Sequence, residues 1–64
     1  MKTLYLSTEL DEADFFNVER AVGHPMSQVL SDTPAINIHT WDNQIVEDAV
    51  YWLGVAGVEV IEIA

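Results

Sequence analysis

Residues 42–63, DNQIVEDAVYWLGVAGVEVIEI, contain the pattern that decides the fold. Gly54 and Gly57 supply the backbone freedom to end a helix, and the β-branched residues 58–63 predict a strand after it. Before the glycines, apolar residues recur at the spacing of one helix face, with Trp52 at its edge: Ile45, Val46, Ala49, Val50 and Leu53. The stretch therefore predicts a helix that packs back onto a sheet.

The start of the chain predicts a strand followed by a helix. Residues 2–7 alternate between apolar and polar, which places Leu4 and Leu6 toward the helices. Thr8, followed three residues later by Asp11, is typical of a helix start, and acids there suit the positive end of the helix dipole. For Asp11 we expect a capping role. The helix presents an apolar stripe of Phe15, Val18, Ala21 and Val22.

The middle of the chain predicts two short strands before the second helix. Gly23 and Pro25 end the first helix, and residues 26–30, MSQVL, are interpreted as a strand. Residues 35–40 alternate again, with Ile36 and Ile38 facing inward and Asn37 and His39 facing outward. Thr40 or Asp42 caps the second helix.

This order of elements predicts an α+β fold, a small ferredoxin-like βαββαβ domain with two helices on one face of an antiparallel sheet. The first and third strands should be central. If residues 26–30 are not a strand, the alternative is a three-stranded sheet with two helices. In the last strand the alternation slips between Val60 and Ile61, which indicates either a bulge or a strand covered on both faces.

The composition favours one folded domain over residues 1–64. Half of the residues are hydrophobic, and there is no cysteine for a disulfide, a thiolate metal site or a nucleophile. The longest apolar run, residues 49–58, is about half of the roughly 20 residues that span a membrane, and the start MKTLYLSTELDE is too acidic for a signal peptide. We expect a protein of the bacterial cytoplasm that is not inserted in a membrane.

The charge balance restricts the partners. Eleven Asp and Glu residues stand against Lys2 and Arg20, which gives a net charge of -9. Such a surface repels nucleic acid and anionic membranes, and it is attracted to basic clefts. A soluble surface usually mixes both signs, so the near absence of cations indicates more than solubility.

The chain lacks the patterns of catalytic and metal sites. His24 and His39 do not have ligand spacing, and the serines lack a nucleophile elbow. Gly54 and Gly57 follow a helix, whereas a phosphate-binding loop precedes one. We expect no enzyme activity, no cofactor and no metal.

Two predicted helix faces combine acids with an aromatic residue. Carboxylates one helical turn apart are separated by about 5 to 6 Å, so such faces can imitate a phosphate backbone. The aromatics are either contact anchors or residues at the edge of the core. The residues expected to contact a partner are Glu12, Asp14, Phe16 and Glu19 on the first helix and Glu47, Asp48 and Tyr51 on the second.

In size, acidity and lack of catalytic motifs, the chain resembles the small phage-encoded inhibitors that include anti-CRISPR proteins and DNA mimics. The resemblance implies a non-enzymatic inhibitor whose partner is a basic nucleic-acid-binding protein, such as a CRISPR effector subunit. The tail AVYWLGVAGVEVIEI, residues 49–63, is also similar in outline to the phage inhibitor of bacterial RNA polymerase.

The residues leave a further alternative, a ferredoxin-like structural or regulatory domain. The open sheet face would present Tyr5, Asn37, His39 and Ile61, which is more apolar surface than a monomer usually shows. Such a domain would dimerise through that face. The sequence is compatible with either a monomer or a homodimer.

Overall fold

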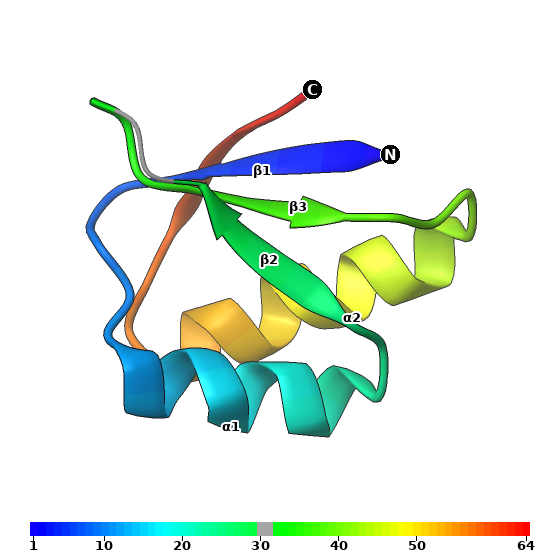
Figure 1. Cartoon of the computed structure of the whole chain (residues 1–64), viewed down its shortest axis with the longest axis horizontal. Helices are drawn as coiled ribbons and strands as arrows, with labels where there is room; N and C mark the ends of the chain where they lie inside the picture. Colours follow the sequence, from blue (N-terminus) through cyan, green and yellow to red (C-terminus); the bar gives the residue numbers. More distant parts are fainter. Residues whose placement is uncertain (30–31) are drawn as a thin grey trace.

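The computed structural model of the chain describes residues 1–29 and 32–64. The elements in order are β1 Lys2–Leu6, α1 Glu12–Val22, β2 Met26–Val29, β3 Ala35–Ile38, α2 Asn43–Val55 and β4 Val60–Ile63. The strands form an antiparallel sheet in the order β2-β3-β1-β4, and both helices cover the same face of it (Figure 1). The predicted ferredoxin-like α+β fold is confirmed, including the central places of β1 and β3. The three-stranded alternative is wrong, because β2 pairs with β3.

The core lies between the sheet and the helices. Its largest fully buried side chains are Leu4, Ile36, Ile38 and Leu53, which the alternation and the helical spacing both predict. Val18 of α1 is also buried, and Phe15 and Val22 pack against this cluster. Full burial of one such aliphatic side chain contributes about 1.5 to 3 kcal/mol. The core therefore fixes which side of each helix remains at the surface.

Both ends of α1 agree with the prediction. Asp11 has the capping role that we expected, and its Oδ1 accepts a hydrogen bond from the Asp14 amide at 2.7 Å. The helix begins after this residue, at Glu12, and not at Thr8. Gly23 has φ 73° and ends the helix. Ala21 was expected in the apolar stripe but is exposed, because it faces the space beside α2 rather than the sheet.

The end of α2 also differs. Gly54 lies inside the helix, which continues through Val55. The stop is at Gly57, whose φ is 83°. There the Val58 amide donates to the Leu53 carbonyl at 2.9 Å, and the Gly57 amide donates to the Gly54 carbonyl at 3.0 Å. This is a Schellman arrangement, in which a glycine takes the left-handed position.

At the start of α2, the structure assigns roles to both of the residues considered for its cap. Asp42 is the N-cap, and its carboxylate accepts from the Gln44 amide at 2.9 Å. The Thr40 hydroxyl accepts from the Asp42 amide at 3.0 Å and so fixes the approach to the cap.

The two edges of the sheet are different. At the β2 edge, the Met26 amide donates to Glu19 Oε2 of α1 at 2.9 Å, and Gln28 Nε2 donates to the Leu10 carbonyl at 3.2 Å. At the β4 edge, the pairs Tyr5 with Glu62 and Leu6 with Val60 pass over Ile61. The predicted slip in alternation is therefore a bulge. At the β2 edge the Glu19 carboxylate therefore occupies one backbone amide, while β4 exposes Ile61 and Ile63.

The connections between the helices and strands lie at two opposite ends of the molecule. The β1–α1, β2–β3 and α2–β4 connections lie at one end, on the left in Figure 1, and the α1–β2 and β3–α2 connections lie at the other. Hydrogen bonds tie the first end together, because the Ser7 amide donates to the Glu59 carbonyl at 2.8 Å and the Leu6 amide to the Pro34 carbonyl at 2.8 Å. Neither α1 nor α2, the helices of the described residues, is long and apolar enough to cross a membrane.

Candidate protein-binding surface

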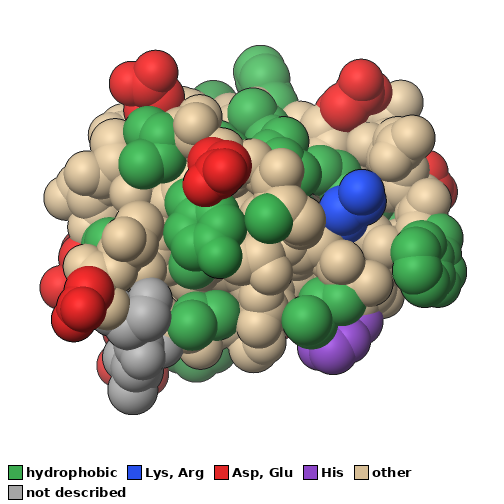
Figure 2. All heavy atoms as spheres, turned by 90° about the horizontal axis from the view of Figure 1, so that it is seen from above, with side chains coloured by type: hydrophobic (Ala, Val, Ile, Leu, Met, Phe, Trp, Pro, Cys, Tyr) green, Lys and Arg blue, Asp and Glu red, His purple; other side chains and the backbone are tan. Residues whose placement is uncertain are grey.

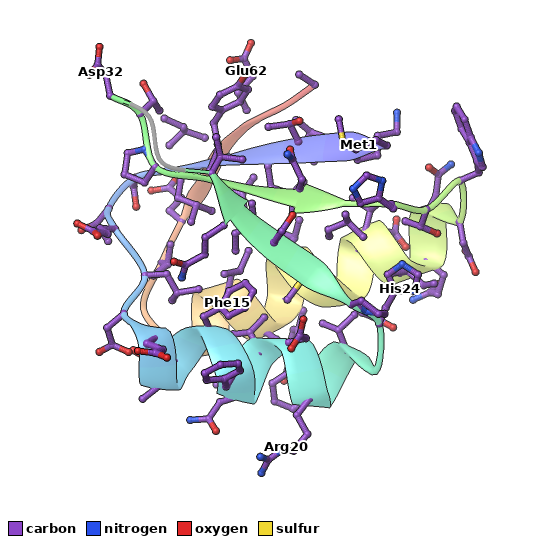
Figure 3. The ribbon with its side chains drawn as sticks, in the orientation of Figure 1. Met1, Phe15, Arg20, His24, Asp32 and Glu62 are labelled. Carbon is purple, nitrogen blue, oxygen red and sulfur yellow. The ribbon has the colours of Figure 1, made fainter. Side chains whose placement is uncertain are left out.

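Most of the eleven acidic residues gather at the end of the molecule that holds the β1–α1, β2–β3 and α2–β4 connections. We call this the acidic end; it comprises Glu9, Asp11, Glu12, Asp14, Asp32 and Glu59. Both basic residues lie elsewhere. Lys2 opens β1 at the opposite end, and Arg20 is in the last turn of α1 and points away from the sheet (Figure 3). The net charge of -9 is therefore distributed unevenly.

The acidic end includes residues that the sequence analysis did not select for a site. Glu9, Asp32 and Glu59 belong to three different connections, and each is exposed. The acids from Glu9 onward form a visible run in the sequence. The strand order brings Asp32 and Glu59 to the same end of the molecule as these acids. The predicted βαββαβ topology was the one feature of the sequence that could have indicated this position.

The predicted face of α1 is partly available to a partner. Glu12 is exposed, and Phe16 is 49% exposed, as expected for a contact residue. Phe15 turns inward, and its ring meets that of Phe16 edge-on at a centroid distance of 5.8 Å. Glu19 was expected to face a partner, but its carboxylate accepts from the Met26 amide. Glu19 is thus a capping group of the sheet edge.

The predicted face of α2 is not continuous with that of α1. The two helices run in opposite directions, so Glu47 and Asp48 lie toward the end opposite the acidic end (Figure 1). Glu47 is exposed, and Asp48 is half-buried and accepts from Gln44 Nε2 at 3.0 Å. Tyr51 is 64% exposed. The predicted acids therefore form two separate surfaces rather than one.

A groove runs between the two helices and adjoins the acidic end. We call it the helix groove; its volume is ≈ 270 Å³, and it is lined by Asp14, Asn17, Val18, Ala21, Trp52, Val55 and Ala56. Trp52 is 37% exposed, and the Tyr51 ring meets it edge-on at 5.1 Å. Asp14 belongs to both the acidic end and the helix groove. The groove thus places an indole ring and a carboxylate along the same depression.

The fold brings the two histidines to the end opposite the acidic end. His24 is half-buried, and its Nε2 lies 3.1 Å from the backbone carbonyl of His39. Trp41, in the connection before α2, is 89% exposed. Over residues 1–29 and 32–64, no group of three or more His, Asp or Glu side chains is placed to hold a metal ion.

The open sheet face carries both polar and hydrophobic side chains (Figure 2). Tyr5 and Asn37 are half-buried, and Thr3 Oγ1 donates to Asn37 Oδ1 at 2.7 Å. Figure 2 looks onto this face and shows acidic side chains that are separated by hydrophobic and polar ones. Ile61 is exposed at the β4 edge. Dimerisation through this face stays a prediction.

No known protein family, curated protein or solved structure matches the chain. The fold and the surface define it as a small ferredoxin-like α+β protein with one strongly acidic end.

Proposed function

We propose that the protein is a non-enzymatic inhibitor that binds, through its acidic end, the basic nucleic-acid-binding site of a bacterial effector protein. The observation that carries the proposal is the concentration of carboxylates at one end, with Lys2 and Arg20 placed elsewhere. A surface of one sign attracts a partner of the opposite sign and accelerates its association. Lysines and arginines that bind phosphate would meet these carboxylates instead.

The neighbouring aromatic side chains support the same proposal. Charge complementarity increases specificity and association rate, but binding energy concentrates in a few aromatic and arginine contacts. Phe16 lies one helical turn from Glu12, and Trp52 lies in the helix groove beside Asp14. The acidic end thus adjoins hydrophobic anchors. Phe16 belongs to α1 and Trp52 to α2, and both helices pack into the core.

The finer proposal concerns the target and the site of action. A CRISPR effector complex fits, because its protein subunits hold nucleic acid in positively charged channels. The inhibitor would act as a nucleic-acid mimic in the bacterial cytoplasm, without a cofactor and without binding nucleic acid itself. The bacterial RNA polymerase, which also holds nucleic acid, is the second target to test.

The test is capture from a bacterial lysate treated with nuclease, with the protein immobilised. We expect a basic nucleic-acid-binding protein to be retained at about 50 mM salt and released at several hundred millimolar, where the Debye length is only a few ångströms. Added duplex DNA should displace it. The variant Glu9→Gln/Glu12→Gln should weaken binding by about fivefold, at roughly 0.5 kcal/mol for each exposed charge pair.

The matched control is Glu47→Gln/Asp48→Asn, which removes the same charge from the other end and keeps an acceptor for Gln44. Its binding should stay close to that of the unmodified protein. Equal losses in the two variants would show that net charge alone matters. A captured protein that binds DNA and this chain at the same time would contradict nucleic-acid mimicry.

A further inference from the structure

The helix groove has the dimensions of a receptor for a single side chain. Its volume of ≈ 270 Å³ is near the lower end of the roughly 300 to 1,000 Å³ of ligand pockets, and the groove is an open depression that a side chain of a partner can enter. Its walls come from two rigid helices, with Trp52, Val55 and Ala56 from α2 and Asp14 and Ala21 from α1. A long side chain with a flat or apolar surface and a polar tip would fill this shape.

The lining specifies the charge of the occupant. Asp14 is the charged residue among those that line the groove, and neither Lys2 nor Arg20 reaches it. The acidic end continues the negative surface on one side of the groove. A second copy of this chain would bring another net charge of -9 toward the same place, which repulsion opposes. The occupant is therefore a cationic side chain of a different protein.

The indole ring decides between the two cationic side chains. A guanidinium group is planar and weakly hydrated, so it can lie flat on an aromatic ring and pair with a carboxylate at the same time. An ammonium group is a compact, strongly hydrated charge and gains less from such a surface. We infer that the helix groove binds an arginine of the target protein, with its guanidinium against Trp52 and toward Asp14.

This inference rests on the proposed function and gives it chemical detail. In nucleic-acid complexes, arginines contact phosphates and stack on unpaired bases. In the helix groove, Trp52 would take the place of a base and Asp14 the place of a phosphate. The mimicry would then include one nucleotide-like contact in addition to charge.

The experiment uses the two tryptophans as separate reporters, because the chain has only Trp41 and Trp52. In the variant Trp41→Phe, Trp52 is the one indole, and its NH resonance and fluorescence are followed during titration with N-acetyl-arginine amide. We expect a saturable change with a dissociation constant on the order of 10 mM. N-acetyl-lysine amide should bind at least about threefold more weakly.

Two controls use the same chain. Trp52→Phe leaves Trp41, which is 89% exposed at the other end, and it should show only a linear response that is equal for both amides. Asp14→Asn, made in the Trp41→Phe variant, keeps the shape of the side chain and should weaken arginine binding by about threefold or more. Thermal unfolding of each variant verifies that it is folded.

The outcomes separate the two proposals. Equal binding of the arginine and lysine amides, or a Trp52 response no larger than that of Trp41, would overturn the groove inference. If those results came with weakened capture by Glu9→Gln/Glu12→Gln, the acidic end would still function as proposed. If arginine bound at Trp52 while that variant retained full capture, the groove would stand and the proposed function would fail.

Discussion

Gly54 and Gly57 show how the position of a glycine sets its effect on stability. Gly54 lies within α2, and a Cβ added there would meet nothing within 4 Å. Gly57 has φ 83°, a conformation that side chains with a Cβ adopt only at a cost. The first glycine therefore weakens its helix, and the second ends it.

We predict opposite changes from the same substitution at these two positions. Gly57→Ala should lower the free energy of unfolding by about 1 to 2 kcal/mol, because alanine is strained in the left-handed conformation. Gly54→Ala should raise it by about 0.4 to 1 kcal/mol through helix propensity and a less flexible unfolded chain. Thermal unfolding measures both, at about 4 to 8 °C per kcal/mol for a domain of this size. A change of the same sign in both variants would contradict the assigned helix end.

At the scale of elements, Glu19 connects α1 to the edge of the sheet. Its carboxylate accepts from the Met26 amide at 2.9 Å, and its own carbonyl accepts from the Gly23 amide at 2.9 Å. The side chain and the backbone of one residue thus hold the connection between α1 and β2. A residue on the outward part of the helical pattern thus also has a structural role.

The variant Glu19→Ala tests this role. It should destabilise the protein by about 1 kcal/mol, because a partly buried amide loses its acceptor, and hydrogen exchange at the Met26 amide should accelerate. Glu19→Gln keeps an oxygen acceptor, so its loss should be smaller although it removes the same charge. Equal effects of the two variants would mean that the charge of Glu19, rather than its hydrogen bond, is what matters.

The helices and strands could largely be predicted from the sequence, whereas several of the contacts between them could not. Periodicity identified both helices and the strands around Leu4 and Ile36, because apolar spacing depends only on local geometry and the need for a core. It did not identify β2, whose residues MSQV have no clear period. The roles of Glu19 and Gly54 were missed, since they depend on where α1 meets β2 and on which glycine takes a positive φ.

The acidic end could not be derived from spacing along the chain. Asp32 and Glu59 are far from Glu12 in the sequence, and the sheet order alone brings their connections to the same end. Of the predicted contact residues, Phe16, Tyr51, Glu12 and Glu47 are exposed, while Glu19 is occupied. Whether the exposed ones contact a partner stays a prediction.

At the scale of the whole molecule, repulsion between the acids acts against folding. The molecule measures 26 × 22 × 16 Å. The Debye length is about 30 Å at 0.01 M salt and about 8 Å at 0.15 M. At low salt every carboxylate therefore repels every other one, whereas at 0.15 M only neighbours do so.

We predict that added sodium chloride stabilises the protein. Between about 0.01 M and 0.15 M the melting temperature should rise by roughly 5 °C, which corresponds to about 1 kcal/mol for a domain of this size. The rise should be smaller in Glu9→Gln/Glu12→Gln, which removes two charges from the acidic end. A melting temperature that is constant or falls with salt would show that the acids are mainly held in favourable local interactions.

The hydrogen bond from the Met26 amide to Glu19 also affects how copies of this protein can join. A fibril grows when each copy offers two unpaired strand edges, because one accepts the preceding copy and the other receives the next. Here the Glu19 carboxylate occupies the Met26 amide of β2, so a strand that added there would have to displace it, and β4 is the more open edge. If two copies paired through their β4 edges, neither would have a second open edge for a further copy, and polymerisation would stop at a dimer.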